Sequence, residues 1–242
     1  MKKINLIFIF LLFMSTVSAQ EKITIWVENF PPLSYKDENG KLKGMITEIV
    51  QFLVKDSNVQ VSNWIMAPWA RAFTETKYSA NTLLYSVVRK PDREDLFYWI
   101  GPVSSRYMYF FKLRSRTDIS VNSINDVKKY QVGTVYKTAA NDFLIKHKIK
   151  AQLAPRFNMN ILKLLAGRID LVLDSDIAFK SRVKELDKDY LKFDKIFLAD
   201  SSKKYYIVLN KNTDTQIVNA LQNSFEKMKR KGLLKTIQKK YR

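Results

Sequence analysis

The sequence predicts an α/β protein built from two similar halves. Runs of alternating apolar residues are separated by segments with helical spacing, first over residues 22–88 and again over residues 132–173. A strongly aromatic extended run at residues 107–113 lies between the two series. With 242 residues, 46% of them hydrophobic, the chain can bury a core as one large domain or as two modest lobes.

The first series begins with a strand at residues 22–28, in which apolar and polar side chains alternate. The segment NFPPL at residues 29–33 ends this strand, and a helix is expected over residues 44–55 because its apolar residues fall on one face. The series continues with a strand at residues 59–66, a short helix opened by Pro68 and a strand at residues 82–88. Strands that alternate with helices favour a parallel sheet.

The second series repeats this alternation. A strand at residues 132–135 precedes a helix capped by Thr138, and a helix at residues 158–166 ends at Gly167. The other predicted elements are strands at residues 151–154, 169–173 and 205–210 and two amphipathic helices at the C-terminal end.

Residues 1–19 have the features of a secretory signal peptide. Two lysines precede an apolar run at residues 4–14, which is shorter than the ~20 residues that span a bilayer, and small residues follow up to Ala19. We expect cleavage after Ala19 and export to the periplasm; an uncleaved anchor helix is the alternative. The next residue is Gln20 and not Cys, so a lipid anchor is not expected.

Composition excludes several classes of function. The chain has 42 Lys and Arg against 23 Asp and Glu, a formal net charge of +19, no Cys and one His. Without Cys there is no disulfide and no thiolate nucleophile, and His147 lies in a charged segment where it cannot serve a metal site or a catalytic triad. We therefore expect no metal and no cofactor. The basic residues are spread along the chain without a nucleic-acid-binding motif, so nucleic acid is not an expected partner.

Four motifs in this order resemble one protein family. They are NFPPL at residues 29–33, the paired glycines Gly40 and Gly44, KPDR at residues 90–93 followed by FYWIGP, and LAGRIDLVL at residues 165–173. Together they are similar to the periplasmic solute-binding proteins of family 3, the amino-acid-type receptors of ABC importers.

The resemblance implies a type II periplasmic binding protein fold. Each lobe would be a mainly parallel sheet flanked by helices, and two hinge strands, near residues 107–113 and 200–208, would join the lobes. Lobe 1 would comprise residues 20–110 and 206–242, and lobe 2 residues 111–205. A monomer, a small-molecule ligand and an inner-membrane ABC permease are the implied assembly and partners.

The resemblance also suggests which arginine holds a ligand carboxylate, a group that a guanidinium binds with two parallel hydrogen bonds. Arg93, in the KPDR segment, occupies the place of the family's carboxylate clamp, although Lys90 replaces the usual Thr. Arg89 is a second candidate. The alternative for either is a surface arginine paired with neighbouring acids.

Further candidates for ligand contact surround the ends of the predicted strands in the first half. Phe30 and Trp69 match aromatic positions that pack against the ligand, with burial in the core as the alternative. Arg71 could add a cation, Ser86 a hydroxyl group, and Glu28 a contact for a cationic group of the ligand.

In the second half, Thr138 opens a helix where the family offers a hydroxyl group and backbone amides to the ligand carboxylate. Lys137 precedes it in place of Gly and adds a further anion contact. The family's ammonium-binding Asp falls on Ser175 by spacing, with Asp174 and Asp176 on either side. Either one of these acids has taken over that role, with helix capping as the alternative, or the ligand is not an α-amino acid.

These observations favour a binding protein that captures a small polar, carboxylate-bearing ligand in a cleft between two lobes for an ABC importer. No catalytic residue is expected. Two alternatives stay open: a periplasmic enzyme on the same fold, such as a cyclohexadienyl-type dehydratase, and a solute-sensing receptor module.

Overall fold

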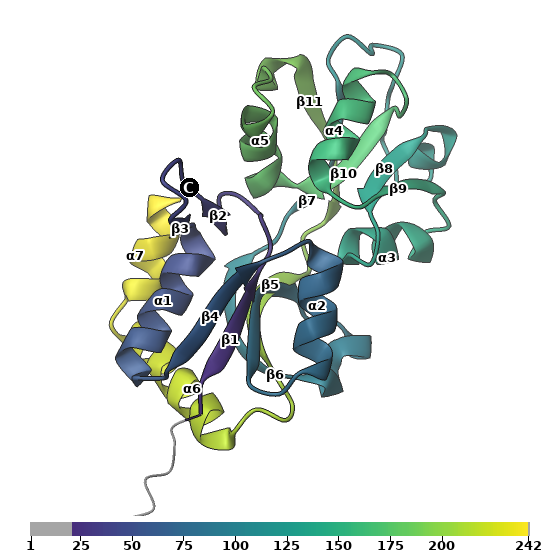
Figure 1. Ribbon diagram of the computed structural model, residues 1–242. Coiled ribbons are helices and arrows are strands. Elements are labelled where there is room, and N and C mark those ends of the chain that lie inside the picture. Colours follow the sequence, from purple (N-terminus) through teal and green to yellow (C-terminus); the bar gives the residue numbers. More distant parts are fainter. Residues whose placement is uncertain (1–20, 242) are drawn as a thin grey trace, which may run out of the picture.

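The computed structural model describes residues 21–241 and has two lobes, each built on its own five-stranded sheet (Figure 1). The first sheet has the order β4 (Val61–Met66), β1 (Ile23–Val27), β5 (Thr82–Val88), β12 (Lys204–Asn210) and β6 (Phe97–Ser105). The second has the order β11 (Phe193–Asp200), β7 (Met108–Leu113), β10 (Leu171–Ser175), β8 (Val132–Val135) and β9 (Ala151–Ala154). The predicted signal peptide lies outside the described residues.

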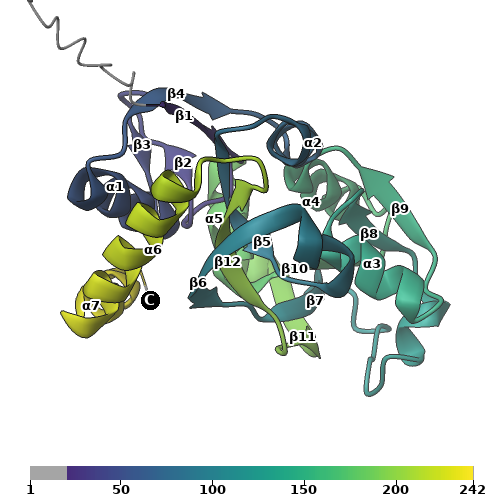
Figure 2. The same ribbon diagram turned by 90° about the horizontal axis from the view of Figure 1, so that it is seen from below.

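Helices cover both faces of each sheet. In the first lobe α1 (Met45–Ser57), α6 (Thr215–Arg230) and α7 (Leu233–Lys240) pack together on one face, and α2 (Trp69–Tyr78) covers the other (Figure 2). In the second lobe α3 (Ala139–Lys146) packs on one face, and α4 (Phe157–Leu165) and α5 (Asp176–Glu185) pack on the other. No helix of residues 21–241 is long and apolar enough to cross a membrane.

The strands are apolar on both sides because both faces of each sheet are buried. Successive side chains of a strand point to opposite faces. Phe110 accordingly packs in the core beneath α3, whereas its neighbour Phe111 stacks on Phe179 of α5 at 3.8 Å between ring centroids. A run of consecutive apolar residues is the expected signature of such a strand.

Each sheet is evenly mixed, whereas we expected mainly parallel sheets. In the first lobe β1 is parallel to β4 and β5, but β12 is antiparallel to β5 and β6. In the second lobe β8 is parallel to β9 and β10, but β7 is antiparallel to β10 and β11. The strand that runs against its neighbours is β12 in the first sheet and β7 in the second. Each of them directly follows a crossing between the lobes, so the chain enters the sheet from the side of the other lobe.

The chain crosses between the sheets twice, at residues 106–107 and at residues 201–203. The backbone N–H of Arg106 donates to the carbonyl of Lys203 at 3.2 Å, so the two crossings run side by side. We expected lobe boundaries at residues 110 and 205. The first crossing comes earlier because the aromatic run after Tyr107 belongs wholly to β7.

Most predicted elements are present, and four strands were missed. The sequence pattern predicted β1, α1, β4, α2, β5, β7, β8, α3, β9, α4, β10, β12, α6 and α7 to within a few residues. It did not predict β6 or β11, each at one edge of its sheet, nor the short pair β2 (Tyr35–Lys36) and β3 (Leu42–Lys43). For the helix α5, the sequence indicated only that Asp174 or Asp176 could cap a helix beginning near residue 177.

We predict that Gly44→Ala lowers the free energy of unfolding by about 3 kcal/mol or more. Gly44 precedes α1 at φ 124°, and an added Cβ would lie 2.4 Å from the carbonyl oxygen of Leu33. Gly40→Ala is the matched control, because Gly40 also has a positive φ but has open space around it; its cost should be about 1 kcal/mol. Urea unfolding of both variants makes the comparison, and equal losses would contradict the steric argument.

Candidate ligand-binding site

A cavity lies where the two lobes meet, with about 420 Å³ of space between protein atoms, part of it open to solvent. Lobe 1, lobe 2 and the crossings all line it. Its walls are Glu28, Phe30, Trp69, Ser86, Val88, Arg93, Arg106, Met108, Thr138, Ala139, Ala140, Phe157, Asp174, Ser175 and Tyr205. Glu28, Ser86 and Asp174 stand at or near the carboxyl ends of β1, β5 and β10, where open α/β sheets bind their ligands.

Arg93 presents a buried cation to this cavity. It lies in a short 3-10 helix, Pro91–Leu96, and is 4% exposed. Its guanidinium lies over the rings of Trp69 and Phe73, at 5.5 and 4.8 Å from their centroids. Within residues 21–241 no ion pair joins it to an acidic side chain. Burial lowers the pKa of Arg93, an effect that the negative charges of Asp142 and Asp92 oppose; an arginine stays charged in proteins, so this cation has acids nearby but, among the described residues, none in direct contact.

Ser86 has a strained backbone and an unsatisfied hydroxyl group. Its φ is +63°, unusual for a residue other than glycine. The register between β5 and β12 shifts here, since Tyr206 pairs with Val87 and Ile207 with Tyr85, which marks a β-bulge at Ser86. The Oγ atom is buried in the cavity wall without a hydrogen-bond partner. Such strain next to an open polar group is typical of a binding position.

The N-terminus of α3 faces the cavity from lobe 2. Thr138 caps this helix: its Oγ1 accepts from the N–H of Asn141 at 3.2 Å and donates to the carbonyl of Val135 at 2.7 Å. The N–H groups of the first helical turn have no partner within a helix, so they attract an anion. Ala139 and Ala140 from that turn line the cavity.

Lys137, which stands where the resemblance implies a glycine, has a left-handed backbone conformation that favours glycine. Its φ is +59°, and its exposed side chain does not line the cavity. Its carbonyl oxygen instead accepts hydrogen bonds from lobe 1, from Trp69 Nε1 at 2.9 Å and from an Arg93 Nη at 3.5 Å. Lys137 therefore contributes its backbone to the contact between the lobes.

Glu28 is a half-buried carboxyl group with no hydrogen bond or ion pair to its side chain within residues 21–241. Burial raises the pKa of Glu28 to about 7, an effect opposed by the positive charge of Arg182 and reinforced by the negative charge of Asp174. At neutral pH this group is therefore poised between its protonated and ionised forms.

Asp174 is engaged inside the protein. It is 1% exposed, and its Oδ1 accepts hydrogen bonds from the Ser175 N–H and from an Nη of Arg182, with which it forms a buried ion pair. Burial raises the pKa of Asp174, and the guanidinium of Arg182 opposes that rise. Asp176, the other acid we considered, lies outside the cavity and pairs with Lys195 at 3.1 Å.

Two of the predicted arginines lie outside the cavity. Arg71 is exposed, with its guanidinium 5.7 Å from the ring centroid of Trp26. Arg89 is exposed and forms an ion pair with Glu94. Both match the surface alternative considered from the sequence. The cavity brings together the other predicted side chains, which are Glu28, Phe30, Trp69, Ser86, Arg93, Thr138 and Asp174.

Several cavity residues were not predicted. Arg106 is 4% exposed at the first crossing and pairs with Asp200 at 2.9 Å. One signal for it existed, since Arg106 is the charged residue between two apolar strands. The spacing of the family motif had fallen on Ser175, but no sequence pattern pointed to the remaining lining residues, which are Val88, Met108, Ala139, Ala140, Phe157 and Tyr205.

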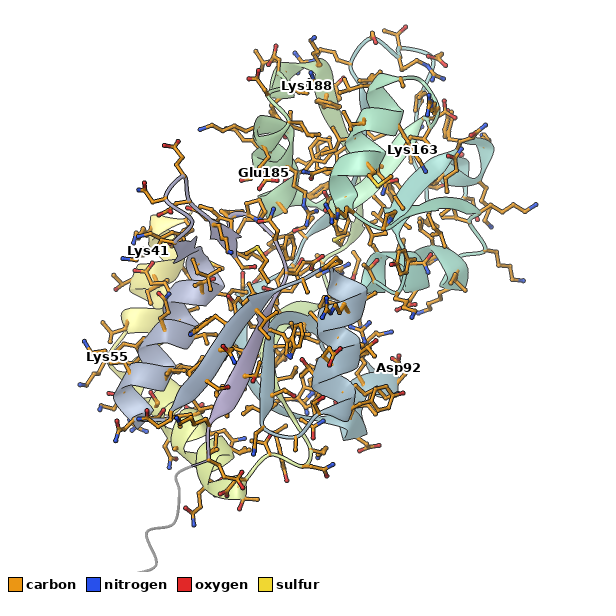
Figure 3. All side chains as sticks on the ribbon, in the orientation of Figure 1. Lys41, Lys55, Asp92, Lys163, Glu185 and Lys188 are labelled. Atoms are coloured by element: carbon orange, nitrogen blue, oxygen red, sulfur yellow. The ribbon has the colours of Figure 1, made fainter. Side chains whose placement is uncertain are left out.

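Direct contacts hold the lobes together around the cavity. Lys90 of lobe 1 forms an ion pair with Asp142 of α3 at 2.5 Å, and Asn29 donates to Glu185 at 3.3 Å. Glu185 lies on the edge of the second lobe that faces the first, whereas Lys55 and Lys188 project from the outer surfaces (Figure 3). The structure is thus a closed arrangement of the lobes, with much of the basic charge outside.

Two lobes that close on a shared cavity define a two-lobed binding protein of the type II periplasmic binding fold. Residues 23–242 match the model of a family described as bacterial extracellular solute-binding proteins, family 3. The chain belongs to this family, which confirms the resemblance carried by its motifs. None of the curated proteins matches the sequence.

Solved structures share the fold at low sequence identity. A histidine kinase sensor domain with similarity to periplasmic binding proteins has a TM-score of 0.82 at 15% identity, over 92% of this chain and 96% of that one. An ancestral arginine-binding protein bound to glutamine has a TM-score of 0.80 at 19% identity, over 91% and 97%. An ancestral amino-acid-binding protein, a precursor of cyclohexadienyl dehydratase, has a TM-score of 0.73 at 15% identity, over 91% and 95%.

We predict that the ligand-free protein loses stability as pH rises through the range in which Glu28 titrates. The folded-state pKa is about 7 and the ordinary value is 4.5, so the folded state holds the proton more tightly. The contribution of Glu28 is complete below about pH 4.5 and is lost as pH rises to about 7, by about 3 kcal/mol at most. Urea unfolding between pH 4.5 and 8 measures this loss.

Glu28→Gln is the matched control for this titration. The amide has nearly the same shape and does not titrate, so the variant should be more stable than wild type at pH 8 and have a flatter pH profile. An unchanged profile in the variant would assign the pH dependence to other groups.

Proposed function

We propose that this protein is a periplasmic solute-binding protein that captures a small carboxylate-bearing ligand between its lobes and delivers it to an inner-membrane ABC permease. The observation that carries the proposal is the buried guanidinium of Arg93, which faces the interlobe cavity without a direct ion pair to an acid among the described residues. A buried charge that is not directly paired is costly, and a ligand carboxylate would supply a direct partner.

The position of Arg93 supports a coupling between binding and closure. Its guanidinium comes from lobe 1 and touches the carbonyl of Lys137, directly before the N-terminus of α3 in lobe 2. A carboxylate at this point would accept from the arginine on one side and from helix amides on the other. A ligand that contacts both lobes binds the closed form more tightly than the open form, and so shifts the population toward it.

Aromatic side chains form the rest of the enclosure. Phe30, Trp69 and Tyr205 line the cavity and are each less than 8% exposed, and Phe30 and Tyr205 meet edge to face at 5.6 Å. Such walls exclude water and bind the apolar part of a ligand. Phe30 also belongs to the core of lobe 1, so a contact with the ligand would add to its role in packing.

An enzyme on the same fold is the second candidate, and Glu28 is the observation that favours it. A carboxyl group with a pKa of about 7 in a cavity is suited to general acid–base catalysis. Turnover of prephenate or arogenate by the purified protein, lost in Glu28→Gln, would support this function. A solute-sensing receptor module is the third candidate, in keeping with the fold shared with a kinase sensor domain.

We expect thermal unfolding of residues 20–242 to respond to one chemical class in a panel of amino acids, organic acids and aromatic precursors. A ligand at 100 times its Kd stabilises the folded state by about 2.7 kcal/mol, which is readily measured as a rise in Tm. A panel without any stabilising member would contradict the proposed function.

We predict that Arg93→Ala raises the Kd of the stabilising carboxylate by about 30-fold or more, because a buried charge pair is worth at least 2 kcal/mol. Isothermal titration calorimetry measures the change. Arg89→Ala is the matched control: it removes a nearby exposed arginine outside the cavity, and its Kd should stay within about twofold of wild type. Equal effects of the two substitutions would refute the clamp.

A further inference from the structure

Arg182 is a fully buried cation held between two aromatic rings. It belongs to α5, is 1% exposed and lies between the lobes. Its guanidinium carbon is 3.8 Å from the ring centroid of Phe157 in lobe 2 and 4.5 Å from that of Phe30 in lobe 1. A cation between aromatic faces, paired with a buried carboxylate, is the environment that proteins build for a cationic ligand group. Here a side chain of the protein occupies it.

The ion pair neutralises the charge of Asp174 through its Oδ1 atom, whereas its Oδ2 atom is buried without a hydrogen-bond partner among the described residues. Asp174 is the aspartate of the cavity wall, and Arg182 already neutralises it. The charge of Arg106 also acts on Asp174. A ligand ammonium group beside Asp174 would therefore meet two guanidinium groups and a carboxylate that Arg182 already neutralises, and Glu28 carries a negative charge only above about pH 7.

The other polar groups of the cavity are suited to an anion. Arg93 is a buried cation without a direct ion pair among the described residues, and the N-terminus of α3 offers backbone N–H groups. Ser86 offers a buried hydroxyl group without a partner. Glu28, protonated below about pH 7, can donate a hydrogen bond to a ligand oxygen.

We propose that Arg182 occupies the place of a ligand cation beside Asp174, so that the cleft selects organic acids that carry a carboxylate and no ammonium group. This inference rests on the proposed solute-binding function. It makes Arg182 a specificity-determining residue. Its guanidinium pairs with Asp174, the carboxylate that the ammonium group of an α-amino acid would need, while Arg93 holds the ligand carboxylate.

Pairs of probes that differ in the ammonium group test the proposal on the wild-type protein. The pairs are 3-phenylpropionate with L-phenylalanine, succinate with L-aspartate, and propionate with L-alanine, measured by calorimetry at pH 6 and 8. In the pair that binds best, the organic acid should bind about 100-fold more tightly than the amino acid.

The outcomes separate this proposal from the proposed function. An amino acid that binds more tightly than its partner acid at either pH would overturn the selectivity and leave the solute-binding function intact. If neither member of any pair binds and the wider panel gives no rise in Tm, the solute-binding function itself fails, and this proposal fails with it.

Arg182→Gln provides the complementary test. With Asp174 released, the ratio of the amino-acid Kd to the organic-acid Kd should fall at least tenfold from the wild-type ratio, or about 1.4 kcal/mol. A folded variant with an unchanged ratio would overturn the role of Arg182. Arg71→Gln, which removes an exposed arginine outside the cavity, should leave the ratio unchanged.

A second variant guards against loss of folding, because Arg182→Gln leaves Asp174 buried without its partner. Arg182→Gln combined with Asp174→Asn removes both charges, and near-ultraviolet circular dichroism reports whether it folds. This double variant has no carboxylate at position 174, so the ratio of the amino-acid Kd to the organic-acid Kd should not fall as it does in Arg182→Gln. A folded double variant whose ratio falls as far as that of Arg182→Gln would contradict the proposal, since the change would then not depend on the released charge of Asp174.

Discussion

The buried ion pair between Arg182 and Asp174 is the interaction on which the interlobe region depends. Both side chains are about 1% exposed, so neither charge is solvated by bulk water. Loss of one partner from such a pair typically costs 3–5 kcal/mol, because the other charge is left buried. The pair also fixes how Phe30 and Phe157 face each other, since the guanidinium lies between the two rings. The pair also affects the pKa of Glu28, because the charge of Arg182 lowers this pKa and the charge of Asp174 raises it.

The fold could largely be predicted from the sequence because interior strands and amphipathic helices have clear periodicities. β5 is buried at every residue and β1 at all but one, and such runs are easily recognised. β11 was missed because it lies at a sheet edge, where half-exposed, exposed and charged side chains mix without a regular alternation. β6 contains a glycine and a proline, residues that usually argue against a strand. The even mixture of parallel and antiparallel pairs depends on the crossings, which local patterns do not encode.

The candidate site was predictable where a residue lies at or near the end of a strand, as Glu28 and Ser86 do, or opens a helix, as Thr138 does. Arg93 was found through its position in a motif and not through any sign that it is buried. Arg182 could not be found in this way, since α5 has no clear apolar stripe and arginines are usually exposed. Arg71 and Arg89 stay exposed to solvent. Burial of a charge is decided by tertiary contacts between residues far apart in the chain.

The position of β12 has a consequence for the order in which the lobes can assemble during synthesis. β12 lies between β5 and β6 in the first sheet, although more than ninety residues of lobe 2 separate it from β6 in the chain. Lobe 2 is continuous in sequence, so a ribosome can deliver all of its strands before β12 emerges. The sheet of the first lobe lacks its strand between β5 and β6 until β12 has been synthesised. Vectorial synthesis therefore favours completion of the second lobe ahead of the first, and truncation near the C-terminus harms the lobe that begins the chain.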